Sequence, residues 1–142
     1  MGSMETPLYR QFSERLFAKY PEWQSRIDPN QGDEIDLSIG VPSPNPKLSN
    51  GLFITVDDEI TVGTNWYHSH FSWGGATAVI DQAMNFIDGF LEEQLVILVF
   101  FRGENWVRSS CAERDKAWEI PNPGERRQVL SWTGKLDSEL AG

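Results

Sequence analysis

Seven consecutive apolar residues at positions 95–101 restrict the fold of this chain more than any other feature of its sequence. The segment LVILVFF is rich in β-branched side chains and lacks polar alternation. Because successive side chains of a strand point to opposite faces, such a segment needs cover on both sides. It is also far too short to span a bilayer. The sequence therefore predicts a central strand with both faces covered.

Patterns on either side of this strand predict the other elements. Apolar residues recur at helical spacing over 7–20 and 76–91, and a charged segment with two prolines predicts a loop at 113–127. Further runs predict strands at 35–39, 52–56, 60–64, 65–73, 106–112 and 129–132. Two helices are too few for a doubly wound sheet. We therefore predict an α+β fold, a mostly antiparallel sheet with an N-terminal helix and a central helix packed on it.

The length of 142 residues is close to the commonest size of one domain, and six Trp and eight Phe favour a packed core. Residues 1–3 are interpreted as a vector-derived extension and residues 4–142 as a single α+β domain. Cys111 is the only cysteine, which fits a reducing compartment. The first residues lack the apolar segment of a signal peptide. We expect a soluble cytoplasmic protein.

The net charge narrows the class of partner. Twelve basic and 21 acidic residues give 12 − 21 = −9. This charge repels phosphate backbones and anionic headgroups, so we expect neither nucleic acid nor a membrane as partner. It favours encounter with a basic protein, although acidity also serves solubility alone. Asp57, Asp58 and Glu59 form the predicted tip of a hairpin, and we predict that they contact the partner; the alternative is a solvated turn.

Trp118 is the second candidate for partner contact. It lies between Lys116 and Glu119 in an otherwise charged segment, where an apolar side chain has little reason to be unless something covers it. Tryptophan is enriched among the residues that dominate binding energy. The cover is either a partner or the sheet of the domain itself. Most of the six tryptophans are expected at core or half-core positions, and Trp118 is the exception.

His68 and His70 form a candidate polar site. Two residues apart on a strand, their imidazoles point to one face, which suits a metal or a small ligand. Zinc needs a third and usually a fourth ligand, and the sequence has no second His/Cys cluster. We therefore interpret them as hydrogen-bonded sheet residues, with a ligand site as the alternative. No metal and no cofactor are predicted.

No complete catalytic motif is found in the sequence. The residues around Cys111 match no nucleophile signature, and a lone cysteine in a strand is usually a small buried hydrophobe. Adjacent carboxylates such as Glu92 and Glu93 point in different directions and do not converge as an acid/base pair. Phosphate-binding loops and zinc-protease motifs are absent from the sequence. We predict a binding protein without catalytic residues.

Several short segments form a recognisable series. They are GLFITV at 51–56, EITV at 59–62, YHSHF at 67–71, and SWTGK at 131–135 followed by Asp137. This series resembles bacterial immunity proteins of polymorphic or contact-dependent toxin systems. The resemblance implies a one-to-one complex with a cognate toxin and no catalysis. Toxins that attack nucleic acid often present basic surfaces, which an acidic inhibitor would complement.

A second hypothesis belongs to a different class. A curved sheet with a helix across it can enclose an aromatic-lined pocket, and His68 and His70 would face that pocket. The chain would then be a small-ligand-binding protein or an enzyme, recognised by a stoichiometric metal or a saturable ligand. Under either hypothesis a homo-oligomer stays open, because edge strands need cover.

Overall fold

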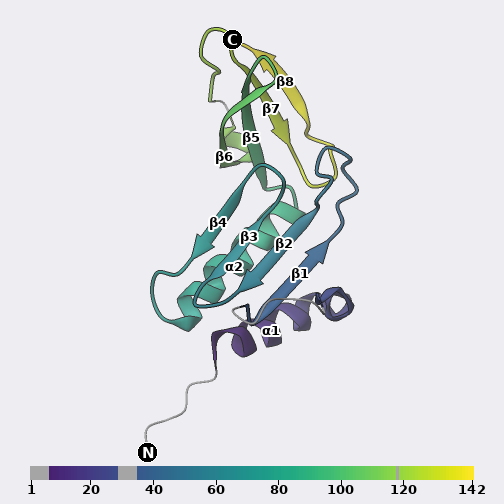
Figure 1. Cartoon of the computed structure of the whole chain (residues 1–142), viewed down its shortest axis with the longest axis vertical. Coiled ribbons are helices and arrows are strands. Elements are labelled where there is room, and N and C mark those ends of the chain that lie inside the picture. Colours follow the sequence, from purple (N-terminus) through teal and green to yellow (C-terminus); the bar gives the residue numbers. More distant parts are fainter. Residues whose placement is uncertain (1–6, 29–34, 118) are drawn as a thin grey trace, which may run out of the picture.

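Strand pairing in the computed structural model divides the chain into two four-stranded sheets (Figure 1). The structure describes residues 7–28, 35–117 and 119–142. The first sheet has the order β1-β2-β3-β4 and the second the order β6-β5-β7-β8, with antiparallel pairing throughout both. Together with the helices, this is a single mixed domain, and the predicted α+β class is confirmed.

The elements have the following bounds. The helices are α1 (Leu8–Lys19) and α2 (Ala76–Leu91), with short 3₁₀ helices η1 (Pro21–Arg26) and η2 (Arg114–Lys116). The first sheet contains β1 (Leu37–Val41), β2 (Leu52–Val56), β3 (Ile60–Gly63) and β4 (His68–Phe71). The second sheet contains β5 (Leu95–Arg102), β6 (Asn105–Glu113), β7 (Arg126–Leu130) and β8 (Ser138–Ala141).

The first sheet has one apolar face, as its alternating sequence predicts. Val56 pairs with Ile60 across the predicted hairpin, and every second residue of β2 is buried. Helix α2 runs across this sheet (Figure 1) and belongs to the same core through its buried residues Val79, Ile80, Ala83, Met84, Ile87 and Phe90. Helix α1 adds Phe12 and Leu16. Apolar burial of this kind contributes roughly 25 cal/mol per Å².

Strand β5 is the central strand that its apolar sequence predicts. It pairs with β6 on one side and β7 on the other. Ile97, Val99 and Phe101 enter the main core. The intervening residues Val96, Leu98 and Phe100 form a second cluster with Val129 on the opposite face. The faces of the second sheet are called inner, towards the main core, and outer, towards this second cluster.

Several predicted bounds differ from the structure, among them those of β1 (Leu37–Val41, predicted at 35–39) and β7 (Arg126–Leu130, predicted at 129–132). The strand predicted at 65–73 is shortened to β4, because residues 64–67 form a bend. The loop predicted at 113–127 contains η2 and the first residues of β7. The strand β8 was not predicted. All of its residues are exposed, and its sequence SELA does not alternate between apolar and polar residues.

Within the described part of the chain, no helix is both long enough and apolar enough to cross a membrane. The longest, α2, has 16 residues and alternates buried with exposed positions. Its buried residues belong to the main core, which includes residues of α1 and of both sheets.

Candidate interaction surface

The β2–β3 hairpin carries its predicted acidic tip at the end of the first sheet. Asp57 and Asp58 are exposed, and Glu59 is half-buried. The turn is fixed from within: the Glu59 backbone N–H donates to Asp57 Oδ1 at 3.0 Å, and the Asp57 N–H donates to the Glu59 carbonyl at 3.0 Å. With Asp36 and Ser72, these residues line an open hollow of about 730 Å³. The structure therefore gathers four carboxylates where the sequence predicted three.

The Glu59 carboxylate is held by His70, a residue of strand β4. His70 Nδ1 lies 2.7 Å from Glu59 Oε1 and 2.9 Å from Thr61 Oγ1. His70 stands directly opposite Thr61 in the β3–β4 register. His70 is thus a hydrogen-bonded sheet residue that orients one carboxylate of the acidic tip, and this arrangement links two sites that the sequence treated separately.

His68 and His70 share one face of β4, as predicted, and both are exposed. Their ring centroids are 4.9 Å apart and their planes nearly perpendicular. The close approach of β3 to His68 depends on Gly63, because a Cβ there would lie 2.4 Å from the His68 Cβ. His68 lines a hollow of about 330 Å³ with Asn65, Trp66, Tyr67 and Trp106, whereas His70 does not line it.

Two tryptophans are candidates for contact with a partner: Trp118, which the sequence predicted, and Trp73, which it did not. Trp118 lies outside the described residues. Trp73, which was expected in the core, is 84% exposed in the turn before α2. It follows Ser72, which lines the acidic hollow. The two glycines after it, Gly74 and Gly75, are the sequence signal that Trp73 lies in a turn beyond the strand.

Cys111 lies on β6 opposite Ile97 and packs against the main core. Burial raises the pKa of its thiol to about 11, so the thiolate is scarce at neutral pH. Burial also raises the pKa of the neighbouring Tyr67 hydroxyl, and the Cys111 thiolate adds to this effect. The arrangement matches a small buried hydrophobe and lacks an activated nucleophile.

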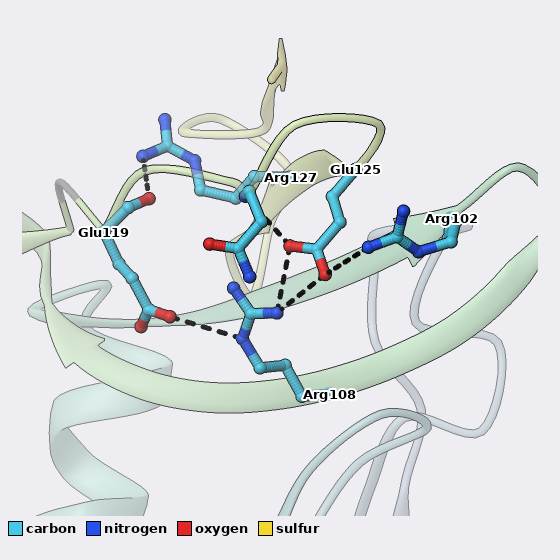
Figure 2. A network of polar contacts seen from close by, with 6 residues as sticks. Arg102, Arg108, Glu119, Glu125 and Arg127 are labelled. Carbon is cyan, nitrogen blue, oxygen red and sulfur yellow. Dashed lines mark hydrogen bonds and ion pairs between the residues drawn. The ribbon is translucent and has the colours of Figure 1, made fainter.

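A network of arginines and glutamates fixes the loop over the outer face of the second sheet (Figure 2). Glu125, with a side chain only 2% exposed, accepts from Arg108 Nη1 at 3.0 Å through both oxygens and from the Asn122 N–H at 3.0 Å. The Arg102 guanidinium lies 3.6 Å away. The Asn122 N–H and the Arg108 guanidinium together hold the pKa of Glu125 below its usual range.

The same loop is bound at a second point. Arg127 Nη1 donates to the carbonyl oxygens of Ala117 and Glu119 at 3.2 and 3.0 Å, and Arg108 Nε lies 3.4 Å from the Glu119 carboxylate (Figure 2). Arg108 also sits over the Phe100 ring, 3.9 Å from its centroid. We call residues 114–117 and 119–125 the covering loop. Sequence reasoning missed this network, because its charges looked like a solvated surface.

The late segment that entered the family resemblance has a structural role here. Asp137 Oδ1 accepts the Ser131 N–H at 2.8 Å, and the buried Asn45 side chain donates to the Ser131 carbonyl at 2.8 Å and to Asp137 Oδ2 at 3.0 Å. Gly134 adopts φ +87 beside Asn45. The Thr133 N–H donates to the buried Glu93 at 2.9 Å. These residues tie the β1–β2 connection to the end of β7.

Among the residues that the structure describes, no group of three or more His, Cys, Asp or Glu side chains is arranged to hold a metal ion. The acidic tip supplies carboxylates, but their geometry matches no cation site. The features that favour contact with another molecule are the acidic hollow, the aromatic hollow beside His68 and the exposed tryptophans.

Comparison with protein-family models, curated proteins and solved structures finds no match to this chain. The resemblance to immunity proteins therefore stays a prediction, based on the sequence segments alone.

Proposed function

We propose that this chain is an immunity-type inhibitor that binds a basic protein toxin through the acidic tip of the β2–β3 hairpin. The observation that carries the proposal is the open hollow of about 730 Å³ that Asp36, Asp57, Asp58 and Glu59 line together with Ser72. Carboxylates gathered in a concave surface attract a basic partner and speed its association. The net charge of −9 acts in the same direction.

The geometry of the tip supports recognition by shape as well as charge. Asp57 is fixed by the hydrogen bonds of its own turn, and Glu59 is fixed by His70. Preorganised groups lose less conformational entropy on binding than free ones. Trp73 stands beside this surface as an exposed aromatic side chain, the type that dominates binding energy when a partner covers it.

The test is affinity capture from a lysate of the source organism with three baits of matched composition. The first bait is the native chain. The second carries Asp57→Lys and Asp58→Lys, and the third carries Glu14→Lys and Glu22→Lys at exposed positions of α1 and η1. Both variants change the net charge from −9 to −9 + 4 = −5, so only the position of the charge differs.

We expect one basic protein to be retained at near-equal amount by the native chain and by the α1/η1 variant. The hairpin variant should bind it at least about tenfold more weakly, because opposite charges are replaced by like charges at the contact. Toxicity of the captured protein, relieved by the native chain, then identifies it as the toxin. Equal retention by both variants would contradict the proposed surface.

A second candidate function rests on the hollow of about 330 Å³ beside His68. Its walls include Trp66, Tyr67 and Trp106, and aromatic walls with a few polar groups are typical of small-molecule sites. A saturable change in tryptophan fluorescence with a small ligand, lost in His68→Ala, would favour it. Metal analysis of protein purified without chelator tests whether this hollow binds a metal ion.

A further inference from the structure

Strand β6 presents a free edge. Within the described chain it pairs with β5 on one side and lies at the end of the strand order β6-β5-β7-β8. Natural sheets protect such edges with lysines, prolines, short strands or bulges. β6 is nine residues long, and its one bulge, where Val107 is the extra residue, lies near its start. The following residues 109–112 read Ser-Ser-Cys-Ala, without charge or proline.

Trp106, at the start of β6, is an exposed aromatic residue of this edge strand and also lines the hollow beside His68. It pairs with Phe101, whose side chain belongs to the main core, so the indole stands on the inner face of the sheet. Its Nε1 donates to Ser109 Oγ at 2.8 Å, which orients the ring along the strand towards the middle of β6. The residue is 54% exposed. A large apolar side chain held in this position calls for cover.

The other end of β6 opens into a hollow on the same face. This hollow measures about 490 Å³ and is lined by Asn85, Phe86 and Gly89 of α2, by Leu95 of β5, and by Gln94, Glu113, Arg114 and Asp115. Glu113 pairs with Leu95, and Leu95 lies on the same face of β5 as the inward-facing Ile97 and Val99. One strand therefore carries an exposed aromatic side chain at its start and, at its end, a hollow in which Phe86 and Leu95 offer apolar contact among charged residues.

This arrangement is self-complementary. A twofold axis perpendicular to the sheet beside Ser110 places a copy of β6 antiparallel to the first and preserves the two faces. The same rotation carries Trp106 of each copy to the Glu113 end of the other, where the hollow opens on the same face. Over Asn105–Glu113 the charges of Arg108 and Glu113 cancel. Two copies can therefore meet at this edge without the electrostatic repulsion that the net charge of the whole chain would cause. A basic partner finds no excess of negative charge here to attract it.

We propose that β6 joins two copies of this chain edge to edge. The two second sheets then form one continuous eight-stranded sheet, four strands from each copy. Each copy inserts Trp106 into the hollow that Phe86 and Leu95 line in the other. The dimer does not depend on the proposed toxin, and the acidic tip is built from a different sheet and remains uncovered.

The first test measures the mass of the purified chain by light scattering across a concentration series. We expect a species of twice the 16.2 kDa chain mass. Trp106→Ala should weaken the dimer at least about tenfold, as expected for a central aromatic contact. The matched control is Trp73→Ala, which removes a tryptophan that is 84% exposed but belongs to the connection between β4 and α2, and its dimer should be unchanged. Circular dichroism verifies that both variants are folded.

The second test traps the register. Pairing about Ser110 places Ser109 opposite Cys111 of the other copy, so Ser109→Cys should form an intermolecular disulfide with the native thiol under mild oxidation. Ser25→Cys, at an exposed position of η1, should form no intermolecular disulfide under the same oxidation. A native chain that is monomeric at every concentration would overturn the proposal. So would a dimer whose dissociation constant is unchanged by Trp106→Ala, because another surface would then hold it.

Discussion

Each sheet has an outer face, the face that points away from the main core, and the two outer faces are built in different ways. In the first sheet the outer face carries Phe53 and the two histidines of β4, and these residues remain half-buried or exposed. In the second sheet the corresponding face carries Phe100, which is fully buried under Arg108 and the covering loop. The comparison shows that polar anchoring can bury an apolar face that neither α1 nor α2 covers.

The largest expected effect compares two phenylalanines. Phe100→Ala should lower the free energy of unfolding by roughly 3–5 kcal/mol, because it opens a cavity in the second cluster. Phe53→Ala, on the half-open outer face of the first sheet, should cost clearly less. Urea unfolding followed by circular dichroism measures both. Equal losses would show that the two faces are buried alike and break the comparison.

The next effect concerns the anchor of the covering loop. The folded-state pKa of Glu125 is depressed, so its contribution to stability is present above the unfolded-state pKa and is lost as pH falls through the folded-state value. Below pH 4.5, the native chain should therefore lose stability that Glu125→Gln does not lose.

At neutral pH, Glu125→Gln should be less stable than the native chain, because a neutral amide replaces the partner of Arg108. Thermal unfolding between acidic and neutral pH measures the difference. Glu119→Gln, whose carboxylate is exposed, is the control and should keep the native acid response. Parallel pH profiles of Glu125→Gln and the native chain would contradict this role.

A smaller effect is expected at alkaline pH, on the inner face of the second sheet. The folded-state pKa of Cys111 is raised to about 11, so its contribution is complete below the unfolded-state value near 9 and is lost as pH rises towards 11. Thermal unfolding at pH 8 and pH 11 should show a smaller loss for Cys111→Ala than for the native chain. Iodoacetamide should also label the native thiol slowly at pH 8. Rapid labelling would show that the inner face is open.

The smallest effect is expected at the acidic tip. Glu59→Gln removes the negative charge from a partly exposed contact with His70, and even a fully charged pair at such a position contributes at most about 1 kcal/mol. Chemical unfolding should therefore be almost unchanged, while binding of the captured basic protein should weaken. A large loss of stability instead would make the tip a structural element of the first sheet.

The parts of the fold that were predictable are those governed by apolar periodicity. The run at 95–101 defines a strand with two covered faces, and the stripes of α1 and α2 define helices, because the hydrophobic effect acts on residues close in sequence. Strand β8 lacks this signal, since all four of its residues are exposed. It pairs with β7 through backbone hydrogen bonds that side-chain pattern does not encode.

The candidate site was predictable in part for the same reason. Acidic residues between two strands predict an exposed tip, and alternation predicts that His68 and His70 share a face. The convergence of Asp36 with the tip depends on the pairing of β1 with β2, which the sequence leaves open. The covering loop was missed because Arg108, Glu119 and Glu125 meet only after β6 and β7 are placed on either side of β5.

The hydrogen bonds of Asn45 can form only near the end of synthesis, because their acceptors lie late in the sequence, and this constrains the order in which the domain is completed. The Asn45 amide binds Ser131 and Asp137, which are 86 and 92 residues further along the chain. The β5–β6 hairpin can form as soon as it leaves the ribosome, whereas β7 reaches β5 only after the covering loop has been made. Until then the apolar outer side of β5 is open to water, and such surfaces promote aggregation. Nascent chains that stall before β7 should therefore depend on chaperones more than completed ones.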